Sequence, residues 1–192
     1  MAVGTRGRGL VVRAVLATGL LLPAALPAQA ATVILVRHAE KAAPDGDPTL
    51  SAAGSARAGA LVAAVADRPV RVIITSEFRR TIETAAPVAT ARGVVPGIVA
   101  ARGGADSNAV ATARALRAAP AGSTALVVGH SNTLGPIIAA LGGPRLPDLC
   151  DGEYATLFVL ELPPRASPRL ARASYGEPDP PAATTCHSAP PT

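Results

Sequence analysis

Residues 32–41 read TVILVRHAEK, and this stretch decides the fold class. Its first part, Thr32 to Val36, is a continuous apolar run rich in β-branched residues, which is typical of a strand buried on both faces. The chain then changes abruptly to arginine, histidine and glutamate. In open α/β sheets, ligands bind at the carboxyl ends of the strands, so the residues that follow such a strand are candidates for chemistry.

Further strands and helices alternate along the chain. Val70 to Thr75 (VRVIIT) and Thr124 to Val128 (TALVV) predict two more buried strands. Ser51 is the expected N-cap of the first helix, and Gly93 is expected to end the second. Helices are predicted over residues 51–66, 79–92, 107–119 and 131–141, and later strands over 154–162 and 170–175. This alternation predicts an α/β fold, a three-layer α/β/α sandwich with a mostly parallel central sheet.

Composition limits the possible classes of protein. The 192 residues are 49% hydrophobic and 16% charged, which suits one domain and excludes disorder throughout. One lysine stands against seventeen arginines, and only 2% of residues are aromatic. Stacking on single-stranded nucleic acid needs aromatic platforms, so no nucleic-acid partner is expected.

The first thirty residues have the layout of a secretory signal peptide. Arg6, Arg8 and Arg13 precede an apolar run over residues 14–26, and Ala28-Gln29-Ala30 follows it. We expect cleavage near Ala30, a secreted or periplasmic protein, and no stable membrane insertion after cleavage. The run is shorter than the ~20 residues of a membrane-spanning helix, and a retained anchor is the alternative.

The predicted cleavage changes the meaning of the net charge. The whole chain carries +5, but removing residues 1–30 leaves fifteen basic and thirteen acidic residues, a charge of +2. The expected domain covers residues 31–176. Residues 177–192 are rich in proline and are predicted to form an irregular tail.

Histidine, arginine or both follow each of the three buried strands. The strands end in Arg37-His38, in a segment that contains Arg79-Arg80, and in Gly129-His130. Histidine can act as a neutral nucleophile near neutral pH, and arginine offers a planar fork for phosphate oxygens. Together they predict a phosphoryl site that needs neither a metal ion nor another cofactor.

Five blocks of sequence are informative through their order and spacing along the chain. They are VILVRHAEK (33–41), LSAAGSARA (50–58), ITSEFRRTIETA (74–85), VVGHSNTLGPIIAALGG (127–143) and EYATLFVLEL (153–162). The blocks resemble the histidine phosphatases, also called the phosphoglycerate mutase-like superfamily, and in particular the short phosphohistidine phosphatase-like members. The resemblance implies the phosphoglycerate mutase-like fold.

The resemblance also implies roles for single residues. His38 is expected to be the nucleophile that becomes phosphorylated, with Arg37 and Arg80 holding the phosphoryl oxygens and His130 completing the pocket. Two neighbouring cations would lower the pKa of His38, which favours attack. Ser131, at the predicted start of a helix, is expected to add hydroxyl or backbone N–H contacts to the anion.

The general acid for the leaving group is not identified by any motif. The residue after His130 is Ser131, whereas some relatives have aspartate there. Asp106, in a glycine-rich loop, is the candidate acid, and Glu77 and Glu153 are its rivals.

Simpler interpretations apply to the remaining polar residues. Arg79 is expected to be a solvated helix residue, Glu40 to orient His38 or Arg80, Lys41 to lie at the rim of the pocket, and His187 to be solvated. Leu50, Ser51 and Gly54 predict a helix start with a close packing contact. The three histidines and two cysteines lack metal-ligand spacing, so no metal site is expected.

The two cysteines, Cys150 and Cys186, predict a disulfide that fixes the tail to the domain, as is usual for an even pair in an exported protein.

Three functions remain open on the sequence. The first is an exported, metal-independent phosphatase that acts on a small phosphorylated substrate, as a monomer. The second is a phosphoglycerate mutase-type phosphotransferase, and the third is a non-catalytic module that binds a phosphorylated ligand.

Overall fold

A single sheet of six strands forms the centre of the computed structural model, which describes Met1, Gly4 and residues 30–181. The strand order is β3-β2-β4-β1-β5-β6. Strands β3, β2, β4 and β1 are parallel to one another, whereas β5 is antiparallel to β1, and β6 is antiparallel to β5. The predicted mostly parallel sheet is therefore confirmed. The strands are β1 (Thr32–Arg37), β2 (Val70–Thr75), β3 (Gly97–Ile98), β4 (Thr124–Gly129), β5 (Thr156–Glu161) and β6 (Arg169–Ser174).

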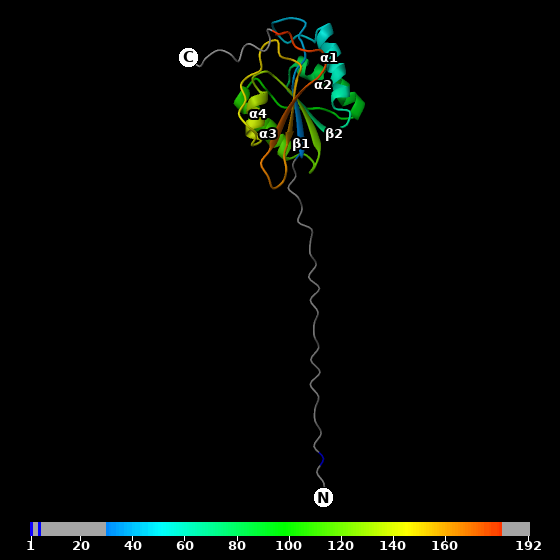
Figure 1. Cartoon of the computed structure of the whole chain (residues 1–192), viewed down its shortest axis with the longest axis vertical. Coiled ribbons are helices and arrows are strands. Elements are labelled where there is room, and N and C mark those ends of the chain that lie inside the picture. Colours follow the sequence, from blue (N-terminus) through cyan, green and yellow to red (C-terminus); the bar gives the residue numbers. More distant parts are fainter. Residues whose placement is uncertain (2–3, 5–29, 182–192) are drawn as a thin grey trace, which may run out of the picture.

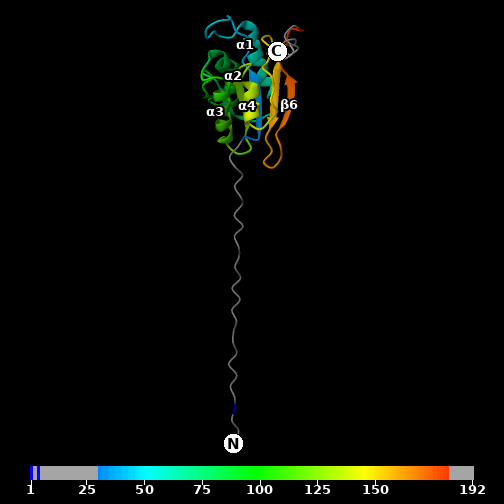
Figure 2. The same ribbon diagram turned by 90° about the vertical axis from the view of Figure 1, so that its left-hand side faces the viewer.

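Helices cover both faces of this sheet (Figures 1 and 2). Helices α1 and α2 pack together on one face, and α3 and α4 pack together on the other. This is the predicted three-layer α/β/α sandwich. The helices are α1 (Ala52–Ala64), α2 (Arg79–Arg92), α3 (Ala105–Arg117) and α4 (Leu134–Ala140).

Strand β1 shows why its sequence is apolar without alternation. Val33 and Leu35 belong to the core cluster beneath α3 and α4, whereas Ile34 and Val36 belong to the cluster beneath α1 and α2. All four side chains are fully buried. Each contributes about 1.5–3 kcal/mol from burial, so the strand that carries the first site residues is firmly held.

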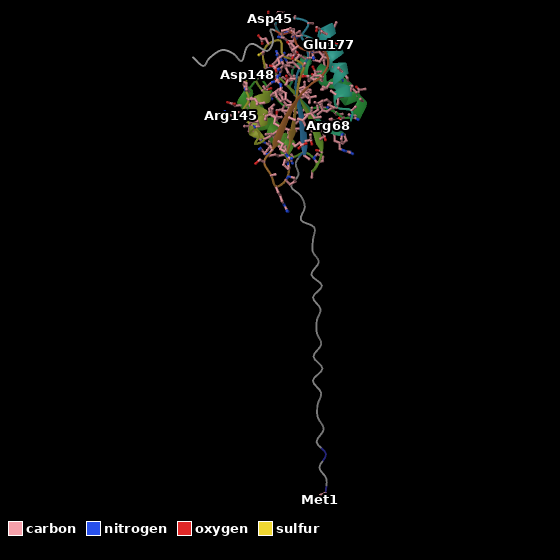
Figure 3. The ribbon with its side chains drawn as sticks, viewed as in Figure 1. Met1, Asp45, Arg68, Arg145, Asp148 and Glu177 are labelled. Atoms are coloured by element: carbon pink, nitrogen blue, oxygen red, sulfur yellow. The ribbon has the colours of Figure 1, made fainter. Side chains whose placement is uncertain are left out.

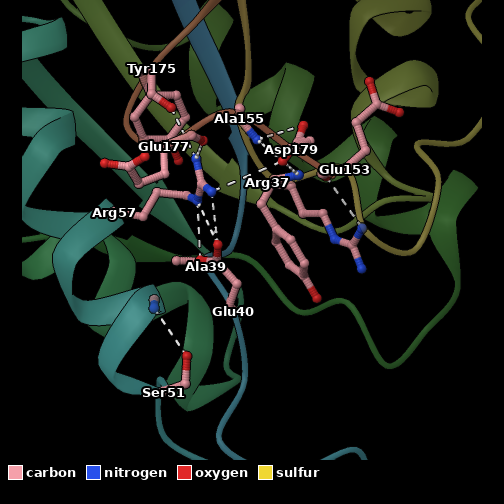
Figure 4. A network of polar contacts seen from close by, with 12 residues as sticks. Arg37, Ala39, Glu40, Ser51, Arg57, Glu153, Ala155, Tyr175, Glu177 and Asp179 are labelled. Atoms are coloured by element: carbon pink, nitrogen blue, oxygen red, sulfur yellow. Dashed lines mark hydrogen bonds and ion pairs between the residues drawn. The ribbon is translucent and has the colours of Figure 1, made fainter. Parts of the chain in front are cut away.

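The ends of the helices follow the sequence signals closely. The Ser51 hydroxyl accepts a hydrogen bond from the backbone N–H of Gly54 at 3.0 Å and so caps α1 (Figure 4). Gly54 lies directly against the backbone of Glu40, where a Cβ atom would clash, which confirms the predicted close packing contact. Gly93 ends α2 in the left-handed conformation, with φ of 62°.

Two local predictions differ from the structure. The two-residue strand β3 is not predicted, because its sequence contains no apolar run long enough to indicate a strand. Helix α4 begins at Leu134 rather than at Ser131, because residues 131–133 form a turn. The Thr133 hydroxyl accepts a hydrogen bond from the His130 N–H at 2.8 Å, a side-chain contact that competes with helix formation.

The structure describes only part of the two terminal segments. The predicted signal peptide, apart from Met1, Gly4 and Ala30, and residues 182–192 lie outside the described residues. Ala30 is fully buried and donates its N–H to the Leu116 carbonyl at 3.1 Å, so this residue packs with the domain expected over residues 31–176, while cleavage near it stays a prediction. At the other end, the Asp179 carboxylate accepts hydrogen bonds from the Tyr154 and Ala155 N–H groups, so packed structure continues beyond residue 176. Within the described ranges no helix is long and apolar enough to cross a membrane.

Candidate active site

The carboxyl ends of β1, β2 and β4 meet at one edge of the sheet. Arg37 pairs with Gly129 across β1 and β4, and the His38 N–H donates to the Gly129 carbonyl at 2.9 Å. In Figure 3, Asp45 and Glu177 are labelled near this end of the molecule. A cavity of about 460 Å³ opens here. Its lining includes all four predicted pocket residues: Arg37, His38, Arg80 and His130.

His38 is held in the form that a nucleophile requires. A backbone carbonyl can only accept, so the 2.8 Å contact between Nδ1 and the Ala39 carbonyl places the ring proton on Nδ1 and leaves the Nε2 lone pair free. The pKa of His38 is lowered to about 3, first by burial and then by the charges of Arg37 and of nearby groups, against the effect of the Ala39 hydrogen bond. Burial, rather than the arginines alone, therefore keeps this imidazole neutral.

Arg37 is anchored by backbone oxygens. Its Nη1 donates to the carbonyls of Cys150 at 2.6 Å and Asp151 at 2.9 Å, and the guanidinium lies 4.3 Å from the centre of the Tyr154 ring. The side chain is only 5% exposed, and its buried Nε has no hydrogen-bond partner among the described residues. A fixed guanidinium with a spare donor suits an oxyanion.

Arg80 has fewer polar contacts with the protein than Arg37 has. Its guanidinium lies 4.3 Å from the centre of the Phe78 ring, and Nη1 lies 3.7 Å from the Asp47 carboxylate. Its Nε is also buried without a partner in the part of the chain that the structure describes. The neighbouring Arg79 instead points to Glu83 at the surface, as the sequence analysis expected.

His130 ends a chain of hydroxyl groups. Its Nε2 lies 3.0 Å from the Ser76 hydroxyl, which lies 2.9 Å from the Thr81 hydroxyl. Because Thr81 donates its proton to the Phe78 carbonyl at 2.8 Å, Ser76 donates to Thr81 and accepts from His130 Nε2–H. Burial, followed by the charge of Arg80, lowers the pKa of His130 to about 4. Any proton added to this ring therefore goes to Nδ1.

Ser131 lines the same cavity, with Lys41 and Asn132. The expectation that Ser131 begins a helix is wrong, since the turn over residues 131–133 precedes α4. Contacts from Ser131 to an anion would come from the turn itself. Lys41 lies at the cavity as expected, with Nζ donating to the Pro44 carbonyl at 2.8 Å.

The structure does not bring the candidate acids into this cavity. Asp106 lies in the first turn of α3 and lines a separate cavity, together with Asp148. The Glu77 carboxylate accepts the N–H groups of Ala101 at 2.8 Å and Arg102 at 3.1 Å. These hydrogen bonds lower the pKa of Glu77 against the opposing effect of burial, so its ionised form is favoured.

Glu153 is occupied by other polar groups. It is 2% exposed, and its carboxylate accepts from the Cys150 N–H, the Thr156 hydroxyl and Arg172. The one acidic residue that does line the cavity, within the described residues, is Asp151, which the sequence analysis missed. Asp151 follows no predicted strand, so no sequence signal pointed to it.

Glu40 pairs with a residue that the sequence did not single out. The buried Arg57 donates from Nε and Nη2 to the Glu40 carboxylate at 2.8–3.1 Å, rather than Glu40 orienting His38 or Arg80 (Figure 4). Arg57 Nη1 also donates to the carbonyls of Tyr175 and Glu177. This network fixes the chain after β6 against the segment that follows His38.

Metal and disulfide predictions have separate outcomes. The described ranges contain no group of three or more His, Cys, Asp or Glu residues that could hold a metal ion. Cys150 is buried, with 4% exposure, but Cys186 lies outside the described residues, so their pairing stays a prediction.

The two buried histidines predict that the protein loses stability in mild acid. Their pKa values rise from about 3 and about 4 in the folded state to the ordinary 6.5 on unfolding, so the unfolded chain binds more protons between these values. Lowering the pH from 6.5 to 5 should therefore reduce the free energy of unfolding by about 2 kcal/mol per histidine. Urea unfolding in phosphate-free buffer measures this loss. His38→Asn should remove about half of it; an unchanged pH dependence in that variant would contradict the assignment.

Comparison with known proteins points to one superfamily. Residues 33–102 match the family described as the histidine phosphatase superfamily (branch 1). No curated protein matches the chain.

Solved structures with the same fold include three bacterial proteins. A mycobacterial glucosyl-3-phosphoglycerate phosphatase in complex with inorganic phosphate is 19% identical, with 76% of this chain and 97% of that chain covered and a TM-score of 0.56. The putative phosphohistidine phosphatase SixA from Agrobacterium tumefaciens is 21% identical, with 77% and 99% covered and a TM-score of 0.54. Bacillus stearothermophilus YhfR is 18% identical, with 73% and 95% covered and a TM-score of 0.57.

Proposed function

We propose that the chain is a metal-independent phosphatase of the histidine phosphatase superfamily, which hydrolyses phosphomonoesters through phospho-His38; the family match over residues 33–102 and the fold shared with solved phosphatases support this. One observation carries the proposal. The unprotonated Nε2 of His38 belongs to a ring that lines a cavity together with Arg37, Arg80 and His130. A neutral imidazole among fixed cations has the properties that attack on a phosphomonoester dianion requires.

The first step forms the phosphoenzyme. His38 Nε2 attacks phosphorus, the N–P bond forms, and the bond from phosphorus to the ester oxygen breaks while that oxygen takes up a proton. Arg37 and Arg80 donate to the phosphoryl oxygens and stabilise the charge that is redistributed over them. The Nδ1–H···O=C bond to Ala39 keeps the ring oriented and stabilises the positive charge that develops on it.

His130 takes part in this step by accepting a proton on its ring. The negative charge of a bound phosphoryl group favours the imidazolium form, and the hydroxyl chain through Ser76 leaves Nδ1 as the site of protonation. The imidazolium then donates to a phosphoryl oxygen. In the second step water attacks phosphorus, the N–P bond breaks, and inorganic phosphate leaves.

Hydrolysis is favoured over mutase chemistry by the shape of the site. The segment between α2 and α3 spans only residues 93–104, so the described domain carries no large insertion above the cavity. Similar solved proteins include a glucosyl-3-phosphoglycerate phosphatase and a putative phosphohistidine phosphatase, and the first of these supports a small phosphorylated substrate. We also propose that residues 1–30 direct export and that the mature enzyme acts as a monomer; sequencing the N-terminus of the exported protein tests the cleavage.

Phosphate release from p-nitrophenyl phosphate tests the proposed function. We expect steady turnover that EDTA leaves unchanged, because the neutral nucleophile and the fixed cations require no metal ion. Adding glycerol as a competing acceptor should divert only a minor share of phosphoryl groups. Loss of turnover in EDTA, or transfer to glycerol without release of phosphate, would contradict a metal-independent hydrolase.

A further inference from the structure

We propose that Asp151 is the general acid that protonates the leaving group, and the general base that then activates water. The proposal rests on the proposed function, because it names the proton donor for the same reaction. It replaces Asp106, which the sequence favoured and which the structure places at another cavity.

The backbone of Asp151 is fixed beside the reacting groups. Its carbonyl accepts from Arg37 Nη1 at 2.9 Å, and the carbonyl of the preceding Cys150 accepts from the same nitrogen at 2.6 Å. The residue is exposed and lines the cavity that holds His38. A carboxyl group on a residue placed in this way can reach the alcohol part of a bound ester.

The Asp151 carboxylate also has fewer hydrogen bonds and ion pairs than the other carboxylates near the site. Glu40 is bound by Arg57, Glu77 by two N–H groups, and Glu153 by three donors. These contacts occupy the carboxylate oxygens and commit the three side chains to contacts within the protein. Within residues 30–181, Asp151 makes no hydrogen bond or ion pair through its carboxylate, so it is able to bind and release a proton during turnover.

Asp47 is the nearest competitor, because its carboxylate lies 3.7 Å from Arg80. However, it also accepts the Arg79 N–H at 3.0 Å, and it does not line the cavity. Its place is at the first turn of α2, where it neutralises the N-terminus of the helix and the Arg80 charge. It does not face the leaving group.

The proton balance of the cycle closes with one carboxyl group. The negative charge of a bound phosphate dianion favours the protonated form of a neighbouring carboxyl group. Asp151 gives this proton to the ester oxygen as the P–O bond breaks and the bond from phosphorus to His38 Nε2 forms. The resulting carboxylate accepts a proton from water as the water oxygen bonds to phosphorus and the N–P bond breaks. The cycle consumes one ester and one water and releases one alcohol and one phosphate.

A series of substituted phenyl phosphates tests this assignment through kcat/KM, which reports the step that expels the leaving group. p-Nitrophenol leaves readily without protonation, whereas phenol needs it. We expect Asp151→Asn to lower kcat/KM for phenyl phosphate by about 100-fold and that for p-nitrophenyl phosphate by less than about 3-fold. Retained activity on p-nitrophenyl phosphate also shows that the variant is folded, and Asp151→Glu should recover part of the loss.

Asp148→Asn is the matched control. Asp148 is an exposed acidic residue in the same loop as Asp151, but it lines the other cavity. It should leave the whole series within about 2-fold of the unmodified enzyme. Equal losses on all esters in Asp151→Asn, or a leaving-group effect in Asp106→Asn instead, would overturn the assignment while leaving phospho-His38 intact. Failure of the unmodified enzyme to release phosphate would instead refute the proposed function itself.

Discussion

Replacing His38 by asparagine is expected to lower the rate of phosphate release by at least about 10⁴-fold, because covalent catalysis loses its nucleophile. The amide group of asparagine can still donate to the Ala39 carbonyl, which the Nδ1–H of His38 contacts at 2.8 Å. The surrounding pocket should therefore keep its shape. Steady-state release of phosphate from p-nitrophenyl phosphate measures the effect.

Binding of inorganic phosphate to the same variant provides the control. Arg37, Arg80 and His130 remain, so the dissociation constant should change by less than about 10-fold, in contrast to the rate. Turnover in His38→Asn within about 10-fold of the unmodified enzyme would show that another group attacks phosphorus.

Replacing Arg80 by methionine should have the second largest effect. Methionine can still pack against the Phe78 ring, but the guanidinium that would bind phosphoryl oxygens is lost. Loss of one donor of this kind costs about 10²–10³-fold in rate. We expect kcat/KM for p-nitrophenyl phosphate to fall by this amount, and Arg80→Lys to recover only a small part, because an ammonium group cannot reproduce the planar fork.

Arg79→Met is the matched control for this measurement. Arg79 is the preceding residue of α2, and its side chain pairs with Glu83, with 57% of its surface exposed. Activity within about 2-fold is expected, since exposed ion pairs contribute little to stability. If Arg79→Met were as damaging as Arg80→Met, loss of helix α2 rather than loss of a phosphate ligand would explain both results.

The sequence predicted the parts of the site that depend on strands. A buried parallel strand projects the residues that follow it from one edge of the sheet, so the positions of His38 and His130 follow from two apolar runs. The choice of Arg80 over Arg79 required the resemblance to the family. The structure agrees with that choice, since Arg80 lines the cavity and Arg79 points to the surface.

Other features depend on contacts between distant segments. Arg57 pairs with Glu40 and with the chain after β6, a separation of about 120 residues that no local pattern encodes. Asp106 and Asp151 are both loop-flanking carboxylates in the sequence, and only the packing of α3 and the anchoring of Arg37 decide which one reaches the cavity. Helix α4 starts late because a single hydroxyl, that of Thr133, bonds to the backbone of His130.

The positions of individual arginines also help to interpret the net positive charge. Among the arginines in the described domain, Arg37 and Arg80 line the cavity, whereas Arg57 neutralises Glu40 inside the protein. Two arginines thus belong to the candidate anion-binding site, and a third belongs to internal packing.

Trapping the phosphoenzyme tests the central claim most directly. Enzyme mixed with p-nitrophenyl phosphate, quenched in alkali during turnover and digested, should carry one phosphoryl group on the peptide that contains His38, labile to acid and stable to base. The His38→Asn variant should carry none. A phosphoryl group on a different residue, or continued turnover with no phosphorylated peptide, would contradict catalysis through phospho-His38.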